Sequence, residues 1–157
     1  MEEVKYERQL VWWLRILFPL FFLLFCILAL VPIYLEYPQF EFWQSNLFFM
    51  LILGISLYWL FFHRFSLLVR YKWFKVVVVL AMPYLLVQVY NTIATFNMYV
   101  DQNYFLDQLF QLPYQRQNWL AQYIRREYLF TGVTAFLTAV ILVFHFIRLL
   151  WFQINKR

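Results

Sequence analysis

Four long runs of apolar residues dominate the chain, and short polar stretches separate them. The runs lie at about residues 11–35, 42–62, 76–100 and 128–152. A helix needs about 20 apolar residues to cross the hydrocarbon core of a bilayer, which is about 30 Å thick. Each run meets that length, and a chain of 157 residues has no further protein layer in which four such helices could be buried. The pattern therefore predicts four transmembrane helices.

The longest polar stretch, residues 101–127, has a helical pattern of its own. Apolar side chains recur in it every three or four residues on both sides of Pro113. We expect two short amphipathic helices that lie on the outer membrane surface, the second leading into the fourth span. They would either cap the bundle or form a docking surface for an extracytoplasmic partner. The predicted fold is one all-α domain over residues 1–157, a four-transmembrane-helix bundle with an amphipathic extracytoplasmic cap.

Composition supports a membrane protein and excludes several other classes. The chain is 65% apolar, 25% aromatic and 13% charged, with a mean hydropathy of +0.64. Soluble proteins are nearer half apolar and a quarter charged. The single cysteine, Cys26, excludes a disulfide within this sequence. It lies inside an apolar run, where a small buried hydrophobic side chain is the ordinary interpretation.

The basic residues are distributed unequally between the two sides of the predicted membrane. Ten of the thirteen lie in the N-terminal segment, between spans two and three, or at the C-terminal end, and three lie in the loop of residues 101–127. Basic residues favour the cytoplasmic side. We therefore expect both termini in the cytoplasm, with the chain in a bacterial inner membrane. The net charge of +5 is then a topology signal, and no nucleic-acid partner is expected.

The loop between spans two and three is short and basic. Its four cations are Arg64, Arg70, Lys72 and Lys75. Near an anionic leaflet each such cation is attracted by about 1 kcal/mol. We interpret these side chains as contacts to anionic lipids, and an acidic protein partner is the alternative.

Polar side chains also recur at helical spacing inside spans three and four. The set in span three is Tyr84, Gln88, Asn91 and Thr95, and the set in span four is Thr131, Thr134 and Thr138. A rise of 1.5 Å per residue brings both sets to a similar height in the outer half of the membrane. Polar groups at that depth are costly unless they are hydrogen-bonded. We expect a helix–helix seam in which Gln88 and Asn91 pair with the threonine hydroxyls; a polar pocket or pore lining is the alternative.

Candidate chemistry is sparse. His63 and His145 lie toward one side of the membrane and are the only candidate haem ligands, although no cofactor and no metal is expected. No carboxylate is predicted at depth, because Glu36, Glu41, Asp101, Asp107 and Glu127 all fall at or outside the outer boundary of the spans. No motif of a hydrolase, a metalloprotease or a phosphate-binding loop is present. The sequence therefore predicts a protein that is not an enzyme.

Three functions are compatible with this pattern. The leading hypothesis is a non-catalytic subunit with an accessory, assembly or scaffolding role in a larger membrane complex, whose partners are other membrane subunits or further copies of itself. The second is a homo-oligomeric channel or small-molecule carrier lined by the polar stripes of spans three and four. The third is a haem-binding subunit for electron transfer.

Overall fold

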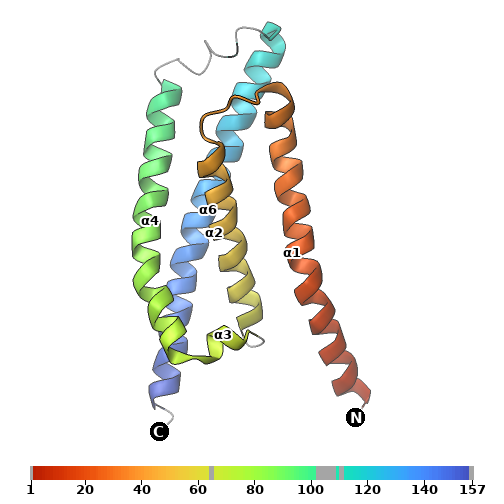
Figure 1. Ribbon diagram of the computed structural model, residues 1–157, viewed down its shortest axis with the longest axis vertical. Helices are drawn as coiled ribbons and strands as arrows, with labels where there is room; N and C mark the ends of the chain where they lie inside the picture. Colours follow the sequence, from red (N-terminus) through yellow and green to blue (C-terminus); the bar gives the residue numbers. More distant parts are fainter. Residues whose placement is uncertain (1, 64–65, 102–108, 110–111, 156–157) are drawn as a thin grey trace.

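The computed structural model describes residues 2–63, 66–101, 109 and 112–155, and these residues form helices and turns without a strand. The long helices are arranged along a common direction (Figure 1). The helix that begins the chain and the helix that ends it have those ends on the same side of the bundle. We call that side the terminal end and the other side the opposite end.

The helices are α1 (Glu2–Glu36), α2 (Trp43–Phe62), α3 (Leu67–Arg70), α4 (Lys72–Asp101) and α6 (Tyr114–Asn155). Within the described residues, α1, α2, α4 and α6 are each long and apolar enough to cross a membrane. A helix is the natural form for such segments, because lipid cannot satisfy backbone N–H and C=O groups and a helix satisfies them internally. The prediction of an all-α, four-transmembrane-helix bundle is confirmed, and the chain is an integral membrane protein.

The start of the last helix differs from the prediction. Residues 114–127, expected as a separate helix on the membrane surface, are the first turns of α6, which is 42 residues long and continues into the fourth span. No proline or glycine interrupts residues 114–131. Leu120 and Ile124 are buried in the bundle, so this segment packs on protein. The other predicted surface helix, over residues 101–112, falls mostly outside the described residues.

An aromatic cluster near the opposite end joins α2, α4 and α6. Tyr128 of α6 stacks on Phe96 of α4 with 4.0 Å between the ring centroids, and Phe49 of α2 meets Tyr128 edge-on at 5.1 Å. Phe40 and Phe42, from the connection between α1 and α2, also contact Tyr128 edge-on. Stacked and edge-on pairs are the favourable arrangements of aromatic rings. The three helices therefore form one closely packed unit at this level.

Helix α1 packs less closely than the other three long helices. It diverges from α2 toward the terminal end (Figure 1), and many of its large apolar side chains are exposed. It approaches α2 closely at Gly54, where an added Cβ would lie 2.5 Å from the Phe22 ring. Nearer the opposite end, the Tyr123 hydroxyl of α6 donates a hydrogen bond to the Ala29 carbonyl at 2.8 Å. These two contacts, together with ring contacts such as Phe18 with Phe62, place α1 beside the bundle.

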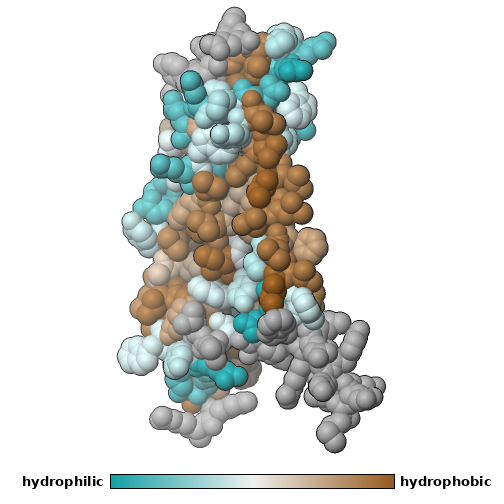
Figure 2. All heavy atoms as spheres, turned by 45° about the vertical axis from the view of Figure 1, so that its right-hand side comes forward, coloured by the Kyte–Doolittle hydropathy of each residue, from teal (hydrophilic) through white to brown (hydrophobic). Residues whose placement is uncertain are grey.

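The outer surface has the banded polarity of a membrane protein. In the view of Figure 2, hydrophobic side chains cover the middle of the molecule, and hydrophilic ones gather mainly toward the two ends. Soluble monomers rarely expose contiguous apolar patches of more than a few hundred Å². The solvent of the middle band is therefore lipid.

One exposed ion pair connects α1 with the start of α6. Arg116 Nη1 lies 3.6 Å from Glu36 Oε1, and the side chains are 68% and 34% exposed. Exposed pairs of this kind contribute about 0–1 kcal/mol. We expect Arg116→Ala to lower the free energy of unfolding by less than about 1 kcal/mol, measured by denaturant titration in detergent micelles. A loss of several kcal/mol would mean that α1 depends on this ion pair.

Candidate functional site

The polar set predicted in span three lies on the outside of the bundle. Tyr84, Gln88, Asn91 and Thr95 of α4 are all exposed, Tyr84 by 68%. The buried face of the same helix carries Val78, Met82, Val89 and Phe96. We name the exposed set the α4 polar stripe. It is directed away from the helices that α4 packs against.

The middle of the α4 polar stripe lies near the middle of the membrane span. A Cβ added to Gly132 would meet both Ile93 of α4 and Phe49 of α2 at about 3.0 Å, so these residues share one level. Gln88 is five residues from Ile93 toward the terminal end, and Gly54 is five residues from Phe49 in the same direction. Gln88 is therefore level with Gly54, which is residue 12 of the 20 in α2.

The contact between α4 and α6 does not use the expected amide–threonine pairs. It is formed by Ile93 against Gly132 and by Phe96 against Tyr128. The hydroxyls of Thr134 and Thr138 donate to backbone carbonyls one turn earlier in α6, those of Phe130 and Thr134. On the other side, the hydroxyls of Thr92 and Thr95 donate to carbonyls of α4 itself. The side chains of Gln88 and Asn91 remain on the exposed face.

A buried polar cluster joins α2 to α6 instead. The Asn46 side chain, which is 0% exposed, donates from Nδ2 to Glu127 Oε2 at 2.6 Å. The Thr131 hydroxyl lies 3.2 Å from Asn46 Oδ1 and 2.9 Å from the Glu127 carbonyl, both acceptors. The other carboxyl oxygen, Glu127 Oε1, is buried without a hydrogen-bond partner in the described residues. One residue from α2 and two from α6 therefore share a polar site inside the bundle.

The sequence pattern does not predict this cluster. It places Glu127 at the outer boundary of the fourth span and does not single out Asn46. The two residues are 81 positions apart, so helical spacing cannot relate them. One local signal exists: Glu127 and Thr131 are four residues apart and so lie on one face of a continuous helix. That signal can be used only once residues 114–127 are recognised as part of α6.

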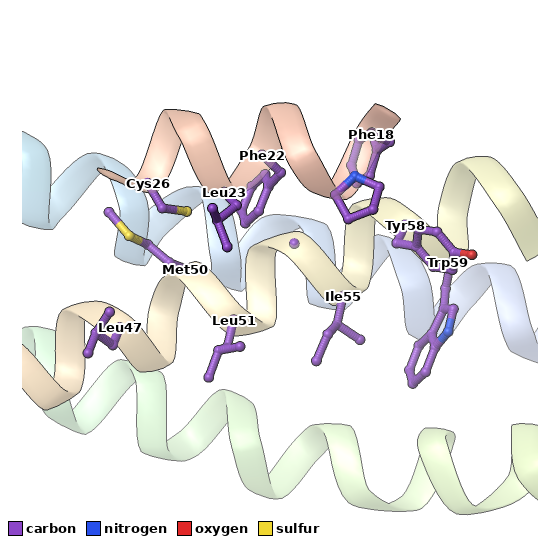
Figure 3. Close-up of a pocket in the computed structure, with 12 residues that line it drawn as sticks. Phe18, Phe22, Leu23, Cys26, Leu47, Met50, Leu51, Ile55, Tyr58 and Trp59 are labelled. Atoms are coloured by element: carbon purple, nitrogen blue, oxygen red, sulfur yellow. The ribbon is translucent and has the colours of Figure 1, made fainter. Parts of the chain in front are cut away.

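An apolar groove lies between α1 and α2 (Figure 3). It has a volume of about 460 Å³. Its lining residues are Phe18, Pro19, Phe22, Leu23 and Cys26 of α1, with Leu47, Met50, Leu51, Gly54, Ile55, Tyr58 and Trp59 of α2. Such a surface can accept a hydrocarbon chain, but it carries no group that would bind a charged ligand or direct a reaction. Cys26 is a free thiol at its edge.

A second hollow, of about 510 Å³, lies between α1 and α6 beside the polar cluster. It is lined by Phe25, Leu28, Ala29, Tyr123, Arg126, Glu127 and Phe130. Glu127 Oε1 is buried, and the Tyr123 hydroxyl already donates to the Ala29 carbonyl. These two groups are therefore not both free to bind a polar ligand in the hollow. We therefore treat the polar cluster as a structural contact between α2 and α6.

The two histidines come together near the terminal end. The rings of His63 and His145 are 4.6 Å apart between centroids and meet edge-on. His63 Nδ1 lies 3.3 Å from the Leu60 carbonyl, and His145 Nε2 is buried without a hydrogen-bond partner in the described residues. Axial haem ligands lie on opposite faces of the porphyrin. Rings in direct contact leave no space for that plane, so this geometry does not fit haem.

The predicted lipid-binding cations also lie at the terminal end. Arg70 and Lys72 are exposed there, at the end of α3 and the start of α4. Lys75 is only 2% exposed, so most of its side chain is packed against protein. Arg64 lies outside the described residues. The exposed cations can reach lipid headgroups, whereas the stem of Lys75 contributes to packing.

Neither a metal centre nor a known relative identifies the site. Among the described residues, no group of three or more His, Cys, Asp or Glu side chains could hold a metal ion. No family model, curated protein or solved structure matches this chain. The most unusual part of the protein's described surface is the α4 polar stripe, because it exposes amides on a membrane-spanning helix.

Proposed function

We propose that this protein is a non-catalytic subunit of a larger membrane complex and that it binds its partner through the α4 polar stripe. The observation that carries the proposal is the exposure of Gln88 and Asn91 near the middle of a membrane-spanning helix. A side-chain amide in hydrocarbon loses its hydrogen bonds to water, which costs several kcal/mol. A partner helix with polar groups at the same depth would restore those bonds.

The neighbouring residues support an interface that lies within the membrane. Exposed apolar side chains, including Val77, Leu80, Val87 and Met98, surround the polar stripe on α4. Helices in membranes associate through close packing together with hydrogen bonds between polar side chains. The stripe and its apolar surroundings offer both.

The channel or carrier hypothesis is less well supported. It requires the polar sets of α4 and α6 to line one pathway. The α4 polar stripe is exposed, whereas Thr131 of α6 is buried and bonded to Asn46 of α2. A subunit that binds its partner through the outer face of α4 would expose this stripe before assembly. It would not require α4 and α6 to line one transport pathway.

We also propose that the terminal end faces the cytoplasm, in a bacterial inner membrane. Exposed Arg70 and Lys72 lie at that end, together with Arg15 of α1 and Arg148 of α6. Cations near a membrane favour the cytoplasmic side and attract anionic lipids. Anionic lipids are therefore the second class of partner that we propose.

Photo-crosslinking in native membranes tests the partner surface. A benzoylphenylalanine in place of Val87, which is exposed one helical turn before Asn91 and on the same face, should form a covalent adduct with another polypeptide. The matched control replaces Leu137 of α6. Leu137 is exposed and lies five residues from Gly132 toward the terminal end, so it is level with Gln88. The hydroxyls of its neighbours Thr134 and Thr138 already donate to backbone carbonyls of α6. This control should give no protein adduct.

Removal of the amides provides the second half of the test. Each interhelical bond in a membrane contributes about 0.6 kcal/mol on average, so the double variant Gln88→Leu and Asn91→Leu should weaken association by about tenfold. The Val87 adduct should decrease accordingly. Equal yields from Val87 and Leu137, or a Val87 yield unchanged by the leucines, would contradict the proposal.

A further inference from the structure

We propose that the partner at the α4 polar stripe is a second copy of this chain, related by a two-fold axis parallel to the membrane normal. In this dimer Gln88 and Asn91 of each copy hydrogen-bond to Gln88 and Asn91 of the other. This inference rests on the proposed function, because it identifies the partner of the same surface.

The chemistry of the stripe is self-complementary. Each side-chain amide of Gln88 and Asn91 carries an NH₂ donor and a carbonyl acceptor. The hydroxyls of Tyr84 and Thr95 also both donate and accept; Thr95 donates to the Asn91 carbonyl at 2.9 Å and keeps its acceptor capacity. A copy of the stripe therefore supplies every type of group that the stripe needs, and no different partner sequence is required.

The membrane makes the two-fold arrangement natural. Two copies of one chain insert with the same topology, so a rotation about the membrane normal leaves every residue at its own depth. Gln88 then faces Gln88, and Asn91 faces Asn91. An interface of this type is closed and uses one patch on both copies, whereas a head-to-tail contact between different patches would need a second polar surface at the same depth.

Nothing on this face of α4 opposes the approach of an identical copy. Residues 76–100 contain no charged residue, so the two surfaces do not repel each other electrostatically. The stripe also lies on the side of α4 away from its buried face, which carries Val89 and Phe96. A second α4 can therefore reach it without displacing α2 or α6.

Cysteine crosslinking tests the two-fold contact directly. In a Cys26→Ala background, Asn91→Cys in native membranes should form a disulfide-linked species of twice 19.6 kDa after mild oxidation. The matched control is Tyr90→Cys, which has the same depth and is 65% exposed but lies about 100° around the helix. The control should remain monomeric. Equal dimer yields from the two positions would overturn the inference.

A second measurement uses only the purified chain. Donor- and acceptor-labelled protein in liposomes should give energy transfer, and its decrease on dilution with lipid gives the dissociation constant of the dimer. Gln88→Leu with Asn91→Leu should raise that constant about tenfold. If purified protein shows no transfer while Val87 still crosslinks to a polypeptide of another mass, the self-association is wrong and the proposed function stands. If Val87 gives no protein adduct either, both fail.

Discussion

Replacing Asn46 by leucine is expected to lower the free energy of unfolding by about 3 kcal/mol. Asn46 is fully buried, and its Nδ2 donates to Glu127 Oε2 at 2.6 Å. Glu127 Oε1 already lacks a hydrogen-bond partner in the described residues. The substitution would also remove the side-chain donor to Glu127 Oε2. A buried acceptor left without its donor costs about 1–3 kcal/mol, because the group has lost water and gained no partner.

Reversible unfolding by SDS in mixed micelles measures this effect. The control combines Asn46→Leu with Glu127→Leu, which removes both the donor and the group that needs it. Because replacing both partners by apolar groups is nearly neutral, the double variant should be more stable than Asn46→Leu alone. Thr131 keeps its bond to the Glu127 carbonyl in every variant. A change below about 0.5 kcal/mol for Asn46→Leu would mean that the polar cluster does not stabilise the contact between α2 and α6.

Replacing Gly132 by valine is expected to destabilise the bundle by about 3 kcal/mol. A Cβ at this position would lie 2.9 Å from Ile93 Cδ1 and 3.0 Å from Phe49 Cε2. Phe49 is fully buried in the aromatic cluster and cannot move aside without disturbing Tyr128. The added methyl groups would therefore separate α6 from α2 and α4 at the level where the three helices pack most closely.

Gly54→Ala is the matched control for this second prediction. Its Cβ would approach the Phe22 ring to 2.5 Å, which is a shorter distance than any at Gly132. Phe22 belongs to α1, however, and is only partly buried in a loosely packed region. We expect its ring to turn away, so that Gly54→Ala costs less than about 1 kcal/mol. The same SDS titration measures the loss of unfolding free energy for both variants. An equal loss for Gly54→Ala and Gly132→Val would show that α1 is held as rigidly as the other helices.

Much of the fold can be predicted from local properties of the sequence. The four apolar runs are recognisable because a membrane requires both length and hydrophobicity from any segment that crosses it. The sequence pattern does not predict the continuity of α6, because residues 114–127 are polar enough to resemble a surface helix. In the structure Leu120 and Ile124 face the bundle and are buried, whereas Trp119 is exposed.

The candidate site was predicted only in part. Helical spacing places Gln88 and Asn91 on one face of α4. It does not determine which way that face is turned. Polar side chains in a membrane can form hydrogen bonds within one chain or between two chains. The spacing of the residues along the helix is the same in both cases. The expected pairing with the threonines of α6 assumed the first case, whereas the exposed side chains of α4 favour the second.

The sequence alone determined that the chain crosses the membrane four times, because each span must satisfy its own backbone hydrogen bonds and meet lipid with apolar side chains. The rotation of each helix about its own axis is set by packing between helices. That rotation depends on contacts between residues far apart in the chain, such as Asn46 with Glu127 and Gly132 with Ile93. Close packing at Gly132 fixes α4 with its apolar face inward, and the same packing turns its amides toward the membrane.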